Sequence, residues 1–258
     1  MSAVATTPAP LALPRPPLLR LTHVELRKAI DTRAGFWLLL IIVLATAAVA
    51  FVRMAVGDQA ERNLLEAYSF AQVPAAVLLP VLAILSVTSE WSQRTALTTF
   101  ALVTQRWRIV VAKLLAALVL SFAAVVVSLL FSALANLIGS AIFTTDGSWS
   151  LPVSALGEAF VFQAIGMLGG AAFGMVFLAS APAIVLYYVL PTVWGILGEV
   201  IPGLDGPSKW LDLGQSTTPL QEFDMSGVAW ARLATSALLW VALPLVIGLM
   251  RIRRTEVS

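Results

Sequence analysis

The longest charge-free stretch of the chain is AFVFQAIGMLGGAAFGMVFLASAPAIVLYYVLPTVWGILG, residues 159–198. A helix needs roughly 20 apolar residues to cross the ~30 Å hydrocarbon core of a bilayer. The 40 residues of this stretch are therefore enough for two crossings. Ser180-Ala181-Pro182 lies near its midpoint. Because proline lacks a backbone N–H and disfavours helix at the residue before it, this position predicts a very tight turn between two membrane-spanning helices.

Four further charge-free stretches, of 18 to 32 residues, lie at 34–52, 67–89, 114–145 and 233–250, and each can form one span. The chain is 59% hydrophobic and 12% charged, with a mean hydropathy of +0.92. A soluble domain is about 45–50% apolar and about 25% charged. We therefore predict an all-α integral membrane protein with six spans. They are expected at about 36–53, 68–89, 109–141, 157–179, 182–200 and 229–250.

The placement of lysine and arginine predicts how the spans are oriented. With the N-terminus inside, twelve of the 16 basic residues lie on the inner side, and the outer segments are mainly acidic. Under the positive-inside rule this places both termini in the cytoplasm. Arginines outnumber lysines thirteen to three, and Ala, Val and Leu are abundant, which is typical of a GC-rich bacterium. The expected location is the inner, or plasma, membrane of a bacterial cell.

The segments outside the spans have distinct compositions. Residues 1–17 carry five prolines and predict a disordered cytoplasmic tail, and residues 251–258 predict a second one. Residues 18–35 alternate apolar and charged residues at helical spacing, which predicts an amphipathic elbow helix on the inner interface, with a bend at Gly35. The longest outer segment, about 201–228, predicts partly ordered short helices.

Prolines also divide the second predicted span. Pro74 and Pro80 fall inside it and predict a kink or local unwinding. Such a distortion is tolerated in a bilayer where neighbouring helices satisfy the freed carbonyl groups.

The composition excludes most catalytic chemistry from this chain. It has no cysteine and one histidine, His23, so a thiolate or multi-histidine metal site cannot be built from one chain. The sequence contains no G-x-S-x-G, H-E-x-x-H or G-x-x-x-x-G-K-[ST] motif. We therefore expect no catalytic site and no cofactor bound by this chain. If ATP is the energy source, another chain must bind it.

The segment after the second span, SEWSQRTALTTFALVTQRWRIVVAK, covers residues 89–113. Glu90 and Arg94 are four residues apart and are expected to pair on one face of a short amphipathic helix. An ordinary loop with inner-side positive charges explains the same pattern. The segment also resembles the permease subunits of ABC-2 type exporters, in Glu90, Thr95, Leu97, Arg106 and Ala112-Lys113. Thr104 stands in the region where that family commonly has a proline before the basic residue.

The resemblance extends to the layout of the whole chain, and it implies an ABC-2 (type V exporter-like) architecture. It further implies a permease that exports an amphipathic or hydrophobic substrate by alternating access. The partners it implies are a second copy of this or a related permease and a separate ATPase subunit that binds ATP and Mg²⁺. The residues expected to couple to that ATPase are Glu90, Trp91, Arg94, Thr95, Leu97, Thr98, Phe100 and Arg106.

Two patterns of four-residue steps mark helix faces inside the bilayer. Ser128, Ser132, Asn136 and Ser140 form a polar stripe in the third span. This stripe either lines a translocation pathway or makes hydrogen bonds between helices. Gly166, Gly170 and Gly174 form overlapping G-x-x-x-G patterns in the fourth span, which predict close helix packing within the subunit or at a dimer seam.

Two other classes of function compete with the exporter interpretation. An ATP-independent secondary transporter or channel has the same general composition, although no charged residue is expected at the bilayer midplane. An intramembrane enzyme is the third alternative, and the missing histidine, cysteine and serine motifs weigh against it. The chemical identity of a substrate does not follow from the sequence.

Overall fold

The computed structural model describes residues 16–92, 106–143 and 148–254. Every regular element in these ranges is helical. The elements are α1 (Leu18–Asp31), α2 (Arg33–Val56), η1 (Gln59–Glu61), α3 (Leu64–Ala71), α4 (Val73–Ser92), α6 (Arg106–Ile142), α7 (Val153–Phe177), α8 (Ser180–Val200), α9 (Asp205–Leu211), α10 (Leu213–Glu222), α11 (Gly227–Ala237), η2 (Leu238–Ala242) and α12 (Leu243–Arg254).

Six helical stretches within the described residues are long and apolar enough to cross a membrane, which confirms the predicted all-helical fold and the number of such helices. They are α2, α3 with α4, α6, α7, α8, and α11 continued through η2 into α12. The turn between α7 and α8 falls at Leu178 and Ala179, just before the predicted position. Leu178 is left-handed (φ 56°), and its N–H donates to Gly174 O, which closes α7.

The predicted distortion of the second span occurs at Gln72, which separates α3 from α4. Val73 and Pro74 follow directly, and Pro80 lies inside α4. The side-chain amide of Gln163 in α7 donates to both the backbone carbonyl and the side-chain oxygen of Gln72, each at 3.0 Å. A neighbouring helix thus supplies hydrogen bonds at the break, as a distorted helix in a bilayer requires.

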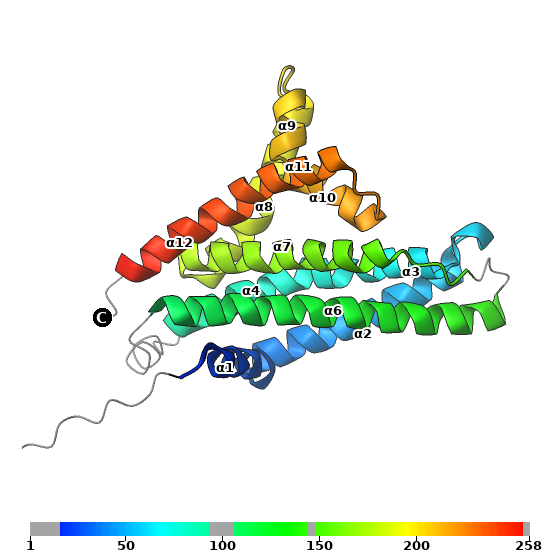
Figure 1. Cartoon of the computed structure of the whole chain (residues 1–258), viewed down its shortest axis with the longest axis horizontal. Coiled ribbons are helices and arrows are strands. Elements are labelled where there is room, and N and C mark those ends of the chain that lie inside the picture. The colour runs from blue at the N-terminus through cyan, green and yellow to red at the C-terminus, as the bar shows by residue number, and fades with distance from the viewer. Residues whose placement is uncertain (1–15, 93–105, 144–147, 255–258) are drawn as a thin grey trace, which may run out of the picture.

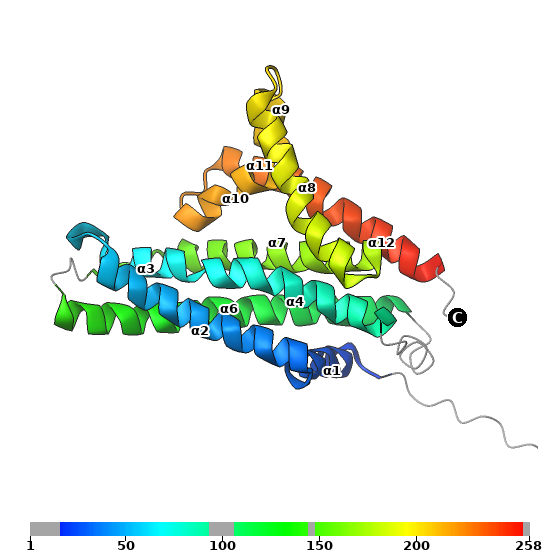
Figure 2. The same cartoon turned by 180° about the vertical axis from the view of Figure 1, so that it is seen from behind.

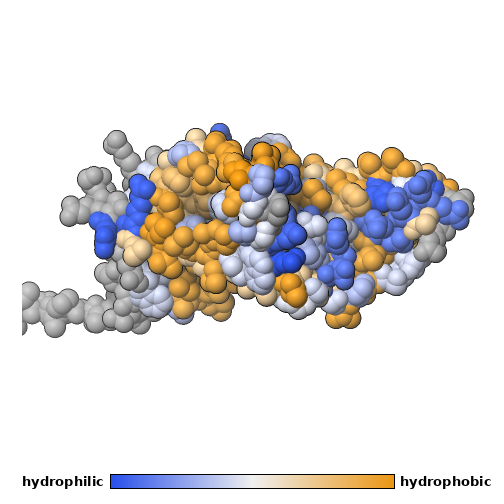
Figure 3. Space-filling model, turned by 90° about the horizontal axis from the view of Figure 1, so that it is seen from above, coloured by the Kyte–Doolittle hydropathy of each residue, from blue (hydrophilic) through white to orange (hydrophobic). Residues whose placement is uncertain are grey.

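The long helices form a bundle with a diverging pair beside it. Figures 1 and 2 show α2, α3 with α4, α6 and α7 running alongside one another, whereas α8 and the α11–α12 stretch lean away and carry α9 at their outer tip. Helix α7 is central, with 56% of its apolar stretch buried, against 11% for α8. Figure 3, a view from the side of α9, shows a surface that is largely hydrophobic, with hydrophilic residues gathered near the two ends and around the middle.

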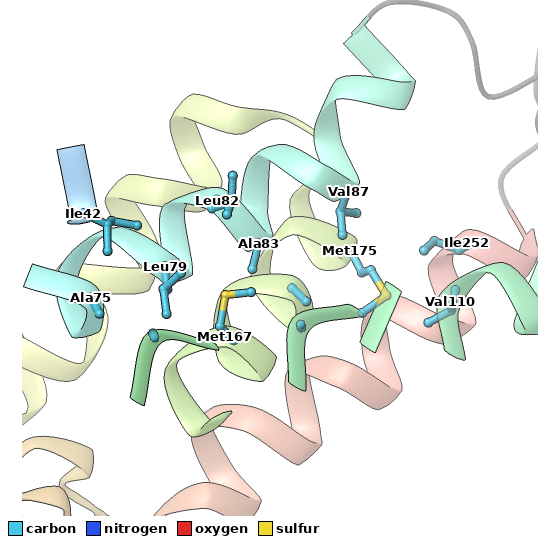
Figure 4. Packing of buried hydrophobic residues seen from close by; sticks show 13 residues of the cluster. Ile42, Ala75, Leu79, Leu82, Ala83, Val87, Val110, Met167, Met175 and Ile252 are labelled. Carbon is cyan, nitrogen blue, oxygen red and sulfur yellow. The ribbon is translucent and has the colours of Figure 1, made fainter. Parts of the chain in front are cut away.

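The largest buried cluster joins α2, α4, α6, α7 and α12 (Figure 4). Leu79 and Ala83 of α4 lie against Met167 of α7, and Ile252 of α12 lies near Val110 of α6. Many members are alanine, valine or methionine. Since lipid is as apolar as leucine, helices in a bilayer associate through close packing rather than through removal of apolar area from water, and small residues permit that packing.

The two ends of the bundle differ in what they carry. The α1 end contains α1, the end of α4, the start of α6 and the end of α12 (Figure 1). The α3 end contains η1 and the starts of α3 and α7. The expected short helices of the 201–228 segment are α9 and α10, and α10 packs against α7, α8 and α11.

Helix α1 crosses the direction of the long helices and buries one face, formed by Thr22, Glu25 and Ala29 (Figures 1 and 2). The bend into α2 lies at Thr32, which caps both helices, and not at Gly35 as the sequence predicts. Gly35 is instead required because the backbone of α2 approaches that of α1 closely at this position. A Cβ atom there would lie 1.9 Å from Ala29 O, so only glycine lets the first turn of α2 fold back against α1.

Candidate functional site

Four charged side chains from three helices meet at the α1 end, and we call them the charge cluster: Glu25, Lys28, Glu90 and Lys113. Glu25 and Lys28 belong to α1, Glu90 to α4 and Lys113 to α6. Lys28 Nζ lies 2.8 Å from both Glu25 Oε1 and Glu90 Oε1. Lys113 Nζ lies 2.6 Å from Glu25 Oε2 and 3.0 Å from Glu90 Oε1. The cluster therefore connects α1, α4 and α6.

Three of the four side chains in the charge cluster are buried. The side chains of Glu25, Glu90 and Lys113 are 8–9% exposed, whereas Lys28 is 42% exposed. Lys113 Nζ also donates to Ser86 O at 2.9 Å, so it has three acceptors. Two positive and two negative charges balance, which is the condition under which buried ions are tolerated.

The pKa of Lys28 shows how the cluster balances burial against charge. Burial alone lowers this pKa, but the carboxylates of Glu25 and Glu90 outweigh it and hold it above its ordinary value. A raised pKa means that the contribution of Lys28 to stability is complete below the ordinary lysine pKa and is lost only as pH rises through the folded value. Lys28 therefore stays charged across the neutral range.

The predicted coupling residues divide between described and undescribed parts of the chain. Glu90 was expected on a docking surface, but its side chain is buried in the charge cluster. Trp91 packs, partly buried, against the main core. Arg106 is the first residue of α6. The remaining members, Arg94, Thr95, Leu97, Thr98 and Phe100, lie outside the described residues.

Sequence reasoning missed Glu25 and Lys28, and it treated Lys113 only as the entrance to the third span. A signal was present, because Glu25 and Lys28 are three residues apart on a helix and Lys113 lies seven residues inside an apolar one. These spacings show that charges enter the bundle. They do not show which charges meet, since Glu25 and Lys113 are 88 residues apart in the chain.

The polar stripe of α6 points into the bundle of this chain over most of its length. Ser128 is buried and donates to Ala71 O of α3 at 3.2 Å. Asn136 is buried and donates to Ser148 O at 3.4 Å, whereas exposed Ser140 bonds to Leu137 O of its own helix. Ser132 is buried, and its hydroxyl has no partner among the described residues. Ser128 therefore makes a hydrogen bond between helices, and Asn136 bonds to the segment that precedes α7.

The glycine stripe of α7 faces α4 within the same chain. A Cβ atom on Gly170 would lie 2.4 Å from Pro80 O, and one on Gly174 would lie 3.2 Å from Ile84 O. Gly166 is less crowded, with Pro80 Cγ at 3.3 Å. The stripe therefore brings the backbones of α4 and α7 together at the proline of α4.

A second feature is a cavity of about 200 Å³ between α7, α8, α10 and the start of α4. Tyr187 and Tyr188 of α8 line it, and Thr217 of α10 faces them. The hydroxyl of Tyr187 donates to Gly166 O at 3.3 Å, and that of Tyr188 donates to Val77 O. Thr192 also lines the cavity, and its hydroxyl donates to Tyr188 O. The other lining side chains are apolar or glycine, so the cavity fits a small hydrophobic group with few polar atoms.

Comparison with known proteins adds no family to these observations. No protein-family model matches the chain, and no curated protein matches it. Within the described ranges, no three histidine, cysteine, aspartate or glutamate side chains gather as a metal site requires. The fold thus defines a class, a helical protein with six helices suited to crossing a membrane, and the charge cluster distinguishes one of its ends.

Proposed function

We propose that this chain is the transmembrane permease subunit of an ATP-driven exporter of the ABC-2 type, paired with a second permease and with separate ATPase subunits. The charge cluster is the observation that supports this proposal. The proposed coupling residues run from Glu90, near the end of α4, to Arg106, the first residue of α6. Glu90 begins this coupling segment and Lys113 follows it, and both bind into the cluster with α1.

In this proposal the cluster makes α1, α4 and α6 move as one unit. An ATPase that displaces the coupling segment then moves both attached helices together. Helix α7 follows α4, because Gly170 and Gly174 leave no space between their backbones. Helix α8 is less tied to this unit, since it buries little of its surface. The cavity lined by Tyr187 and Tyr188 lies between the two parts, where a rocking motion changes its width.

A test of this function begins with the complex that the tagged full-length chain forms in its own membranes. The purified complex is reconstituted in liposomes, and ATP hydrolysis is measured over a small panel of drugs, lipids, peptides and glycans. We expect one class to stimulate hydrolysis and to be transported. Transport should stop when the P-loop lysine of the ATPase partner is replaced. Transport that persists in that variant would overturn the proposal in favour of an ATP-independent transporter or channel.

The proposed orientation places the α1 end in the cytoplasm of a bacterial cell, and it can be tested because the chain has no cysteine. Ser150→Cys and Gly206→Cys, at exposed positions away from α1, should react with a membrane-impermeant maleimide in intact cells. Asp31→Cys, exposed in α1, should react only after the cells are permeabilised. Labelling of Asp31→Cys alone in intact cells would show that the orientation is the reverse.

A further inference from the structure

An apolar groove of about 440 Å³ lies where α1 meets the outer face of α6. Its walls come from α1, α6 and α7. The lining residues are Leu19, Thr22, Leu115, Leu118, Val119, Phe122 and Phe160. The rings of Phe122 and Phe160 meet edge to face, with centroids 6.3 Å apart, at the end of the groove away from α1. Apart from Thr22, whose hydroxyl already donates to Leu18 O, every lining side chain is hydrocarbon.

The end of the groove at α1 is bordered by positive charge. Arg108 lies seven residues before Leu115 in α6, which places it on the same helix face, two turns nearer the α1 end. Arg108 donates one N–H to Pro16 O at 2.6 Å, and a guanidinium has five N–H donors. No acidic side chain among the described residues pairs with Arg108.

The dimensions of the groove match one leaflet of a bilayer. From Arg108 to Phe122 is about 21 Å at 1.5 Å per residue. Half of the hydrocarbon core is about 15 Å deep, so the groove reaches from the headgroup region to near the bilayer centre. Helix α1 closes the groove at the charged end. A partner helix, about 10 Å wide, would collide with α1 if it ran along this face of α6, whereas a lipid chain ends at its headgroup there.

We propose that this groove binds one anionic phospholipid, with an acyl chain along Leu115, Val119 and Phe122 and the negatively charged headgroup against Arg108. The apolar walls select a hydrocarbon chain, and the guanidinium of Arg108 selects a headgroup with a net negative charge. A basic residue near an anionic headgroup is worth about 1 kcal/mol, which is about fivefold in affinity. This lipid site lies on the outside of the bundle and does not depend on whether the protein exports a substrate.

The test uses native mass spectrometry of the purified full-length chain in detergent. Phosphatidylglycerol and phosphatidylcholine with identical acyl chains are added at equal concentrations. We expect the chain to bind phosphatidylglycerol more tightly. The variant R108Q should lose about fivefold in affinity for phosphatidylglycerol and less in affinity for phosphatidylcholine, whose phosphate is balanced by its own choline. Equal preference in wild type and R108Q would overturn the headgroup assignment.

A second pair of variants tests the groove itself. Val119→Trp places a large ring in the groove and should remove the tightly bound lipid of either kind. Leu134→Trp adds the same ring at an exposed position of α6 outside the groove and should change nothing. Because both side chains are partly exposed, neither variant requires repacking of the core, and thermal stability checks this. Undiminished lipid binding by Val119→Trp would overturn the proposal. So would a Val119→Trp protein that loses a dimer of this chain and not a bound lipid, because the groove would then bind a second copy.

Discussion

Lys113→Met should lower the free energy of unfolding by about 3–5 kcal/mol, the usual effect of removing one partner from a buried ion pair. Methionine is similar in size but cannot donate to Glu25, Glu90 or Ser86 O, so two buried carboxylates are left with only Lys28. The measurement is reversible unfolding by a denaturing detergent in mixed micelles. The expected loss is large compared with a typical stability of about 5–15 kcal/mol.

The chain supplies a matched control for this variant. Lys209 is exposed, so Lys209→Met removes the same charge without disturbing the cluster and should change stability little. A double-mutant cycle then isolates the interaction energy between Glu90 and Lys113. Glu90→Gln combined with Lys113→Met should be less destabilised than the sum of the single variants, by about 0.5–3 kcal/mol. A Lys113→Met protein as stable as Lys209→Met would show that the cluster does not hold α1, α4 and α6 together.

Gly170→Ala should destabilise the protein by about 1–3 kcal/mol through overpacking between α4 and α7. The added methyl would lie 2.4 Å from Pro80 O and 2.9 Å from Pro80 Cα. Both are backbone atoms, so the contact is relieved only if the two helices separate. The same detergent unfolding experiment measures the effect.

Two other glycines of α7 give the graded comparison that this prediction needs. Gly157→Ala meets nothing within 4 Å and should stabilise the helix by roughly 0.5–1 kcal/mol, because alanine loses less backbone entropy. Gly166→Ala should fall between them, since its nearest neighbour is the Pro80 ring at 3.3 Å. If Gly170→Ala stabilised the protein as Gly157→Ala does, α4 and α7 would not be in close contact.

The helices could be predicted from the sequence because hydrophobicity is a local property. A charge-free run such as residues 34–52 has to span or be buried whatever the remainder of the chain does. Proline is also a local signal, and Pro74 and Pro182 predicted distortions close to Gln72 and Leu178. The bend before α2 was displaced to Thr32 because a cap depends on which side chain reaches a free N–H, and Thr32 Oγ1 accepts from Gly35 N.

Contacts between helices required three-dimensional information. The G-x-x-x-G spacing predicted that α7 packs closely, but not that its partner is the proline-bearing turn of α4 in the same chain. The spacing of the polar stripe of α6 likewise did not show that Ser128 bonds to α3 and Asn136 to Ser148 O. Each outcome depends on the neighbouring helix, about which a spacing pattern contains no information.

The charge cluster separates what the sequence determines from what depends on the tertiary structure. Composition and charge spacing alone were enough to predict a helical protein with six helices long and apolar enough to cross a membrane, because a bilayer imposes a length and a polarity on every crossing. Which ions pair depended on folding, because Lys28 and Glu90 are 62 residues apart and meet only after α1 has folded back across α4 and α6. A buried charge requires a partner, but its identity is set by the packing of helices and not by their sequences taken one at a time.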